Sequence, residues 1–374
     1  MNSVFREIEK IRGGEPLNSV DLISNRYTVV CQESDRTQTA YCFAVPIRNI
    51  KNNNIVDLNF SHSKLGSAFF GSEAKITVGD RVSLVNSHGR CDIVFQGRVS
   101  KKTKEAIYYN DQHMEIRPTL NGVLVIIDSN ELQLIQNLTL RMDRSFGSVR
   151  ENGKCFCIMR EEYIPFVIVS CVGVLNNRGQ VIAPCEVYSR KISDMEYALT
   201  FSTTEKTGSR IAIEINMQET KLFQDTTVES NCPKANNAFG GMSFLGKTKN
   251  FGEQWLYSRL EISNISQLQT KRIIKTILHI PRLGCDMTPI SVHRISKRFC
   301  SFGSTWENKV AVSEEISESS VSDGYYHIDM TRLLGDLRNR SENFVIRGRS
   351  ANKPAVIPTG DNFYAPQILE VKFQ

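Results

Sequence analysis

Long apolar runs are missing from this sequence of 374 residues. It contains no stretch of about 18 consecutive apolar residues, so no membrane-spanning helix is predicted. The first residues, MNSVFREIEKIRGG, carry charges where a secretory signal would have its apolar segment. We therefore expect a chain without a membrane span that is made and kept in the cytosol unless cell lysis releases it.

Motifs for catalysis are also missing. The sequence has no G-x-S-x-G, no H-E-x-x-H and no EF-hand loop. Its six histidines are separated from one another along the chain, and they are His62, His88, His113, His279, His293 and His327. His279 and His327 lie in strand-like runs, where a hydrogen-bonded core or face histidine is the more common role. We expect no enzyme activity and no cofactor.

Clustered cysteines are lacking too. The ten cysteines are dispersed, and most lie in apolar runs, which is typical of small buried hydrophobic residues. Only Cys155 and Cys157 are close together. A single C-x-C without a second pair is more typical of strand alternation than of a metal site. We expect ten free thiols and no metal.

Charge of one sign is weak in this chain. The net charge is +6, and the basic residues are scattered, with Lys101, Lys102 and Lys104 forming the densest run. Such a run is more often a solvated face than a nucleic-acid site. No nucleic-acid partner is expected.

The composition is that of a folded protein with several cores. The chain is 40% hydrophobic and 23% charged, unlike disordered sequences, which have few hydrophobic residues and high charge. Single hydrophobic cores stop growing at roughly 250–300 residues, so two or three domains are expected.

The N-terminus has the pattern of a short amphipathic helix. Val4, Phe5, Ile8 and Ile11 fall on one face at helical spacing, and two glycines follow. This apolar stripe is our candidate partner-binding surface, by which an N-terminal attachment region would hold the chain on a larger particle. The alternative is that the stripe packs on its own domain.

From residue 26 onward the hydrophobic period is two, which indicates β-strands. We predict an all-β fold of multi-domain β-sandwiches with a short N-terminal helix. The expected domains are 1–130, 131–228 and 229–374, and the last is expected to be jelly-roll-like. The polar residues 224–237 are the expected linker. A second short helix is expected around Thr331, with Leu333, Leu334 and Leu337 packing on the sandwich. The alternation of Leu369, Val371 and Phe373 with Ile368, Glu370 and Lys372 predicts a final strand with one buried face.

Residues 241–248, GMSFLGKT, match the phosphate-binding pattern G-x-x-x-x-G-K-[ST]. That site needs a buried strand before the loop and a helix after it, because the helix N-terminus supplies part of the anion site. Here a loop precedes the pattern and a strand-like run follows it. We interpret the match as a glycine-containing turn between strands.

Five segments of the last third occur in the order typical of one family. They are the Asn236–Gly241 opening that leads to Phe244-Leu-Gly246, the strand Tyr257–Ile262, the Thr305-Trp306 pair, the segment Tyr326–Thr331 with its Asp-x-Thr, and the closing segment Pro366–Phe373. Together they resemble the DNRLRE family, which is also described as a carbohydrate-binding module related to alginate- and chondroitin-binding sandwiches. The resemblance covers the last third of the chain.

This resemblance implies a glycan-binding module. Its candidate ligand-binding residues here are Trp255, Tyr257, Tyr325, Arg347 and Arg349. Trp306 is expected to be a core residue and not a sugar-binding one. Because family members normally belong to surface proteins and this chain shows no export signal, the leading hypothesis is a particle protein. The alternative is an exported cell-surface glycan-binding protein without particle association.

The particle hypothesis is a non-enzymatic structural or adhesion component of a bacteriophage or phage-tail-like particle. The chain would be a fibre, decoration or baseplate accessory protein of the virion, assembled in the bacterial cytoplasm. Its partners would be other particle proteins, further copies of itself in a homo-oligomer, and host-surface polysaccharide. Repetition on one body would strengthen weak single-site sugar contacts.

Overall fold

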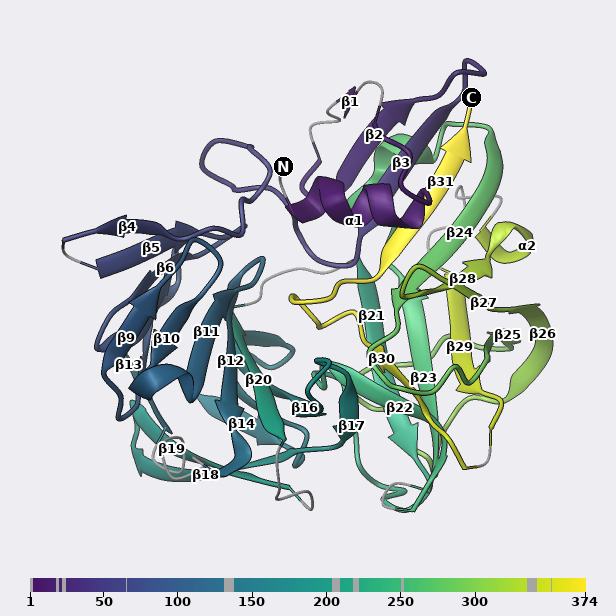
Figure 1. The fold of residues 1–374 in the computed structure, drawn as a ribbon. Coiled ribbons are helices and arrows are strands. Elements are labelled where there is room, and N and C mark those ends of the chain that lie inside the picture. Colours follow the sequence, from purple (N-terminus) through teal and green to yellow (C-terminus); the bar gives the residue numbers. More distant parts are fainter. Residues whose placement is uncertain are drawn as a thin grey trace. The chain divides into compact units, whose positions relative to one another are not determined.

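The computed structural model describes residues 3–17, 20–21, 25–64, 66–130, 138–203, 209–217, 222–249, 252–334, 342–350 and 352–374. Strands dominate it (Figure 1). Its short helical elements are α1 (Ser3–Ile11), η1 (Asn110–Gln112), η3 (Ile262–Leu268) and α2 (Thr331–Leu334). The expected all-β fold with a short N-terminal helix is confirmed. Within these ranges no helix is long and apolar enough to cross a membrane.

The chain forms two compact units. One unit joins Met1–Arg48 to Thr220–Gln374, and the other is Asn49–Glu219. This division differs from the three consecutive domains 1–130, 131–228 and 229–374 expected from the sequence. The reason is strand pairing between distant segments, which a pass along the chain does not reveal.

The unit Asn49–Glu219 contains two antiparallel sheets. The first has the order β14 (Ser148–Glu151), β15 (Cys155–Glu161), β16 (Ile164–Leu175), β20 (Arg210–Met217), β12 (Gly122–Asp128), β11 (Met114–Pro118), β10 (Ile107–Tyr109) and β9 (Val99–Lys102), with β17 (Val181–Ala183) added to β16. The second has the order β18 (Glu186–Ser193), β19 (Glu196–Ser202), β13 (Leu138–Met142), β8 (Gly89–Val94), β7 (Arg81–Asn86), β6 (Lys75–Val78), β5 (Gly66–Phe70) and β4 (Ser61–Ser63). Both sheets mix strands from either side of residue 130, so residues 49–130 of the predicted first domain and 131–219 of the predicted second domain form one unit.

The other unit also contains two antiparallel sheets. One has the order β1 (Val20–Asp21), β2 (Thr28–Gln32), β3 (Gln38–Phe43), β31 (Ile368–Phe373), β24 (Ile273–Pro281), β28 (Tyr325–Asp329) and β27 (Ser320–Ser322). We call it the terminal sheet. The other has the order β26 (Val312–Glu318), β25 (Ile290–Ile295), β29 (Glu342–Gly348), β23 (Gly252–Leu260), β22 (Met242–Thr248) and β30 (Ala355–Pro358), with β21 (Phe223–Glu229) paired to β23. We call it the pocket sheet.

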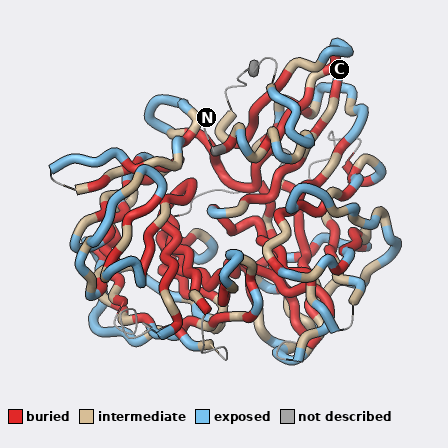
Figure 2. Tube along the Cα trace, in the orientation of Figure 1, coloured by how far each residue is buried: buried red, intermediate tan, exposed pale blue. Residues whose placement is uncertain are grey.

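The two ends of the chain meet in the terminal sheet. Strand β3 pairs antiparallel with β31, with Ala40 opposite Val371 and Cys42 opposite Leu369. These four side chains are buried in one core that both sheets of the unit share, as a β-sandwich requires. The predicted alternation of the last strand is confirmed, since Leu369, Val371 and Phe373 all face this core. Figure 2 shows the buried strands of the unit.

The predicted linker 224–237 is wrong for its first half, because β21 is a buried strand. The polar side chains of β21 are typical of a loop, but in the fold they have hydrogen-bond partners. The hydroxyls of Thr227 and Ser243 are hydrogen-bonded to each other, and Gln254 donates to Glu229 at 3.1 Å. Buried polar groups are tolerated when they are hydrogen-bonded in this way.

The apolar stripe of α1 packs on its own chain. Val4 and Ile8 are buried, whereas Phe5 and Ile11 are half-buried. The candidate partner-binding surface is therefore largely covered, which is the alternative that the helical pattern left open. The expected second helix is present as α2: it begins with Thr331, whose backbone N–H binds Asp329, and it buries Leu333 and Leu334. Leu337 lies outside the described residues.

Candidate functional site

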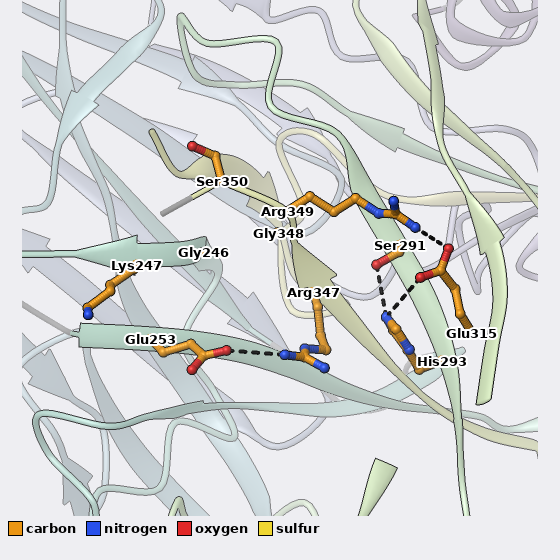
Figure 3. Close-up of a pocket in the computed structure, with 10 residues that line it drawn as sticks. All are labelled: Gly246, Lys247, Glu253, Ser291, His293, Glu315, Arg347, Gly348, Arg349 and Ser350. Atoms are coloured by element: carbon orange, nitrogen blue, oxygen red, sulfur yellow. Dashed lines mark hydrogen bonds and ion pairs between the residues drawn. The ribbon is translucent and has the colours of Figure 1, made fainter. Parts of the chain in front are cut away.

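The pocket sheet carries a polar cavity of about 560 Å³ (Figure 3). Its lining comes from neighbouring strands and from the end of β29. The lining residues are Gly246, Lys247, Glu253, Ser291, His293, Glu315, Arg347, Gly348, Arg349 and Ser350. Because the sheet order places β26, β25, β29, β23 and β22 side by side, alternate residues of these strands converge on one face.

The phosphate-binding pattern at 241–248 forms strand β22 of this sheet. Gly246, Lys247 and Thr248 stand opposite Gln254, Glu253 and Gly252 in the β22–β23 ladder. A phosphate-binding loop needs a helix directly after it, and here a strand follows instead. The segment is thus the arm of a hairpin, whereas the sequence suggested a turn.

Arg347 is held at the pocket by two groups from β23. Its guanidinium carbon lies 4.3 Å from the centre of the Trp255 ring, which is its direct cross-strand neighbour. One of its terminal nitrogens lies 3.3 Å from Glu253 Oε1. The same oxygen accepts a 2.7 Å hydrogen bond from Trp255 Nε1. This geometry combines cation–π and ionic contacts on one arginine.

Arg349 lies on the other side of the cavity, where the chain leaves β29. It forms an ion pair with Glu315 and a second one with Glu318, with 3.3 Å between Arg349 Nη1 and Glu318 Oε2. Figure 3 shows Arg349 pointing toward Glu315 and Arg347 toward Glu253. Each arginine therefore has a carboxylate neighbour that orients it along the pocket wall.

His293 lies beside the ion pair of Arg349 and Glu315. Its Nε2 is 2.9 Å from Ser291 Oγ and 3.9 Å from a carboxylate oxygen of Glu315. Burial lowers the pKa of His293, and the charge of Arg347 lowers it further, while Glu315 opposes the shift. In a Ser-His-acid triad the serine and the acid occupy different ring nitrogens. Here both lie at Nε2, so these three residues do not form such a triad.

The aromatic faces near the pocket are covered by cations. Lys309 Nζ lies 3.9 Å from the centre of the Trp306 ring and 5.5 Å from that of Trp255. The two indole rings are 5.1 Å apart, and both are half-buried against a small core. Stacking of a sugar on either tryptophan would have to displace Lys309 or Arg347. The accessible groups of this pocket are therefore mainly charged and polar.

The five candidate ligand-binding residues do not form one surface. Arg347 and Arg349 line the pocket, and Trp255 lies directly behind Arg347. Tyr257 is fully buried and donates its hydroxyl to the carbonyl of Val310 at 2.6 Å. Tyr325 is buried on the terminal sheet, where it donates to Glu7. Neither tyrosine is exposed for a ligand in this structure.

No family model matches this chain, and no curated protein matches its sequence. The structure shows the β-sandwich class, whereas the carbohydrate-binding resemblance stays a prediction. Among the described residues, no group of three or more histidine, cysteine or acidic side chains is arranged to hold a metal ion. The close pair Cys155 and Cys157 lies on strand β15, with 3.9 Å between its buried sulfur atoms.

Sequence reasoning missed several lining residues, namely Lys247, Glu253, Ser291, His293 and Glu315. Two signals pointed toward them. His293 and Ser291 are two apart on one strand, so their side chains share a face. Lys247 attracted attention only as part of a phosphate-binding pattern. Nothing in the sequence states that β25 lies between β26 and β29, and that strand order assembles the pocket.

Proposed function

We propose that this chain is a non-enzymatic binding protein whose pocket sheet recognises an acidic glycan. The observation that carries the proposal is the charge of the pocket wall. Three basic side chains, Lys247, Arg347 and Arg349, and two carboxylates, Glu253 and Glu315, line the pocket, so its lining has an excess of one positive charge. Glu318, the second partner of Arg349, lies outside this lining. Arginine pairs are well suited to carboxylate and sulfate groups.

The polar lining supports a saccharide. Sugar hydroxyls both donate and accept hydrogen bonds, and Ser291, Ser350 and a neutral His293 offer matching groups. The resemblance of the last third to a carbohydrate-binding module agrees with this assignment. The cations over Trp255 and Trp306 favour ionic contacts over the aromatic stacking that neutral sugars commonly use.

The wider role that we propose is that of a structural or adhesion component of a bacteriophage or phage-tail-like particle. The resemblance to surface-binding modules supports it, with the glycan pocket facing a host surface. Attachment through Val4 and Ile8 receives no support from the fold, because both side chains are buried. Co-purification of the full chain with capsid, sheath or tube proteins would test this role.

Glycan binding can be tested by affinity electrophoresis and calorimetry of the full chain. Alginate and chondroitin sulfate serve as acidic probes and dextran as the neutral probe. We expect binding of an acidic probe that weakens at least about tenfold in Arg349→Gln, which corresponds to about 1.4 kcal/mol. Arg332→Gln is the matched control, because Arg332 is an exposed arginine of the same unit that pairs with Glu314 outside the pocket. Equal binding by both variants, or no binding of any acidic probe, would reject the proposal.

A further inference from the structure

The N-terminal helix α1 is fastened across the terminal sheet. Figure 1 shows it crossing the sheet near β3 and β31. At the middle of the helix, Tyr325 of β28 donates its hydroxyl to Glu7. Just after its C-terminal end, Arg12 donates to Glu33 at 2.8 Å and to the Tyr41 hydroxyl at 3.0 Å. A nine-residue helix is marginal by itself in water, so these contacts and the burial of its apolar stripe hold it in place.

The face under α1 is opposite to the shared core. Val29 and Tyr41 are cross-strand neighbours on this face, and both are buried together with Cys31. Their neighbours Val30, Ala40 and Cys42 point the other way, into the shared core. Removing α1 would therefore uncover an apolar surface on the terminal sheet without opening the shared core.

A polar chain crosses the same face. Glu370 Oε2 lies 3.0 Å from His279 Nε2, the Nδ1 atoms of His279 and His327 lie 2.7 Å apart, and His327 Nε2 lies 2.9 Å from Ser322 Oγ. We call these four residues the histidine relay. His279 and His327 are direct cross-strand neighbours on β24 and β28, and His279 is 2% exposed.

The contact between the two Nδ1 atoms has room for one proton. One ring must donate an N–H and the other must accept it on a lone pair. Either ring can be an imidazolium while the contact persists, because the charged ring donates. If both rings were charged, two N–H groups would point at each other across 2.7 Å. The closed arrangement therefore tolerates one charged histidine and not two.

Several charged groups face the relay. Glu370 of β31 and Asp323 of the turn before β28 favour protonation of His327, and the Ser322 carbonyl does so too. Burial opposes these groups and is the largest cause of the lowered pKa of His327, and the charge of His279 lowers it further. Tyr41 of β3 lies near Glu370, whose charge helps burial to raise the pKa of that phenol.

Tyr325 connects the relay to the helix. Its ring centre is 6.3 Å from that of His327, and its hydroxyl binds Glu7 of α1. Burial and the neighbouring Glu7 raise the pKa of Tyr325, so the phenol stays a donor across the ordinary pH range. A shift of His327 away from His279 would thus displace Tyr325, and Tyr325 would in turn disturb its hydrogen bond to Glu7 of α1.

We propose that α1 is a pH-sensitive latch, which mild acid releases from the terminal sheet by placing a second proton on the histidine relay. Release uncovers the surface around Val29, Cys31 and Tyr41. A histidine with a lowered pKa in the closed state makes the open state bind more protons. The latch is therefore fully stable above the ordinary histidine pKa of about 6.5, and it weakens as the pH falls through that value.

Hydrogen exchange of the full chain at pH 7.5 and pH 5.5, corrected for intrinsic rates, tests the latch. One histidine with an open-state pKa of about 6.5 can shift opening by about tenfold at pH 5.5. We expect exchange protection of α1 to fall about tenfold at pH 5.5, while that of β23 is unchanged. In His327→Gln the protection of α1 should be the same at both pH values. The control His88→Gln, which changes the other unit, should behave as the wild type.

Tyr325→Phe tests the contact with α1 separately from the histidine relay. This variant loses the bond to Glu7, so α1 should be less protected at both pH values while the roughly tenfold fall remains. If His327→Gln does not fold, His279→Gln removes the same Nδ1 contact and serves in its place. The proposal is overturned if wild-type α1 is equally protected at both pH values. It is also overturned if the histidine variants keep the fall, or if β23 loses protection together with α1.

Discussion

Lys247 and Glu253 stand directly opposite each other in the β22–β23 ladder. The lysine of the phosphate-binding pattern is therefore part of a hairpin arm, and its side chain is exposed at the rim of a polar pocket. A ladder position leaves the backbone N–H groups of the segment engaged with a neighbouring strand, whereas a phosphate loop must present them to the ligand.

We predict that the full chain does not bind ATP at micromolar concentrations, with or without magnesium. Titration calorimetry and a fluorescent nucleotide analogue would measure this. Neither Lys247→Ala nor the control Lys297→Ala, a change outside the pocket, should alter this absence of ATP binding. Micromolar binding that Lys247→Ala removes would show that the ladder opens into a phosphate loop.

Gly246 is needed for strand geometry. Its φ is +110°, and a Cβ placed there would lie 2.7 Å from the Ser350 carbonyl oxygen. We expect Gly246→Ala to lower the free energy of unfolding by about 1–3 kcal/mol, because strained backbone and a close contact are added together. Gly147→Ala is the control, since a Cβ at that position has no atom within 4 Å. Urea denaturation of both variants would measure the difference, and equal midpoints would contradict the prediction.

Domain excision should follow the two units and not the sequence order. A fragment of residues 231–374 lacks β3, which pairs with β31, and β21, which pairs with β23. We expect it to show no cooperative thermal transition. Residues 49–219 expressed alone, and residues 1–48 linked directly to 220–374, should each melt cooperatively by circular dichroism. A cooperative melt of the 231–374 fragment would show that its remaining strands suffice.

None of the ten cysteines should form a disulfide, and their thiols should react in two groups. Cys232, Cys285 and Cys300 are exposed, and the other seven are buried. Burial raises the pKa of Cys42 to about 12, so its reactive thiolate is rare at neutral pH. Ellman's reagent should modify three thiols quickly in the native protein and ten in denaturant. Fewer than ten in denaturant would indicate a disulfide, and rapid modification of more than three in the native protein would indicate local opening.

Strand periodicity predicted local structure well in this chain. The alternation of Leu369, Val371 and Phe373 predicted a final strand with one buried face, and the structure buries all three in the shared core. The helical spacing of Val4 and Ile8 predicted α1, and both side chains lie against the chain. Local patterns succeed here because the side-chain period of a strand or helix is a property of the backbone.

Polar strands escaped that analysis. Strand β21 contains Asp225, Thr226 and Thr227, a composition typical of a linker, yet all three are buried. Their hydrogen-bond partners come from elsewhere in the chain, such as Ser243 for Thr227 and the Gly360 backbone for Asp225. A buried polar strand is stable only with such partners, and its sequence does not show them.

The sequence by itself determined that this chain is all-β, that it begins with a short amphipathic helix, and which faces of its strands are apolar. These properties depend on neighbours within a few residues. Only the tertiary structure decided that β3 pairs with β31, that Arg347 lies over Trp255, and that His279 meets His327. Each of these contacts joins residues far apart in the chain, or depends on which strands lie side by side. The physical reason is that packing of both sheet faces selects the strand order, and that selection involves the whole chain at once.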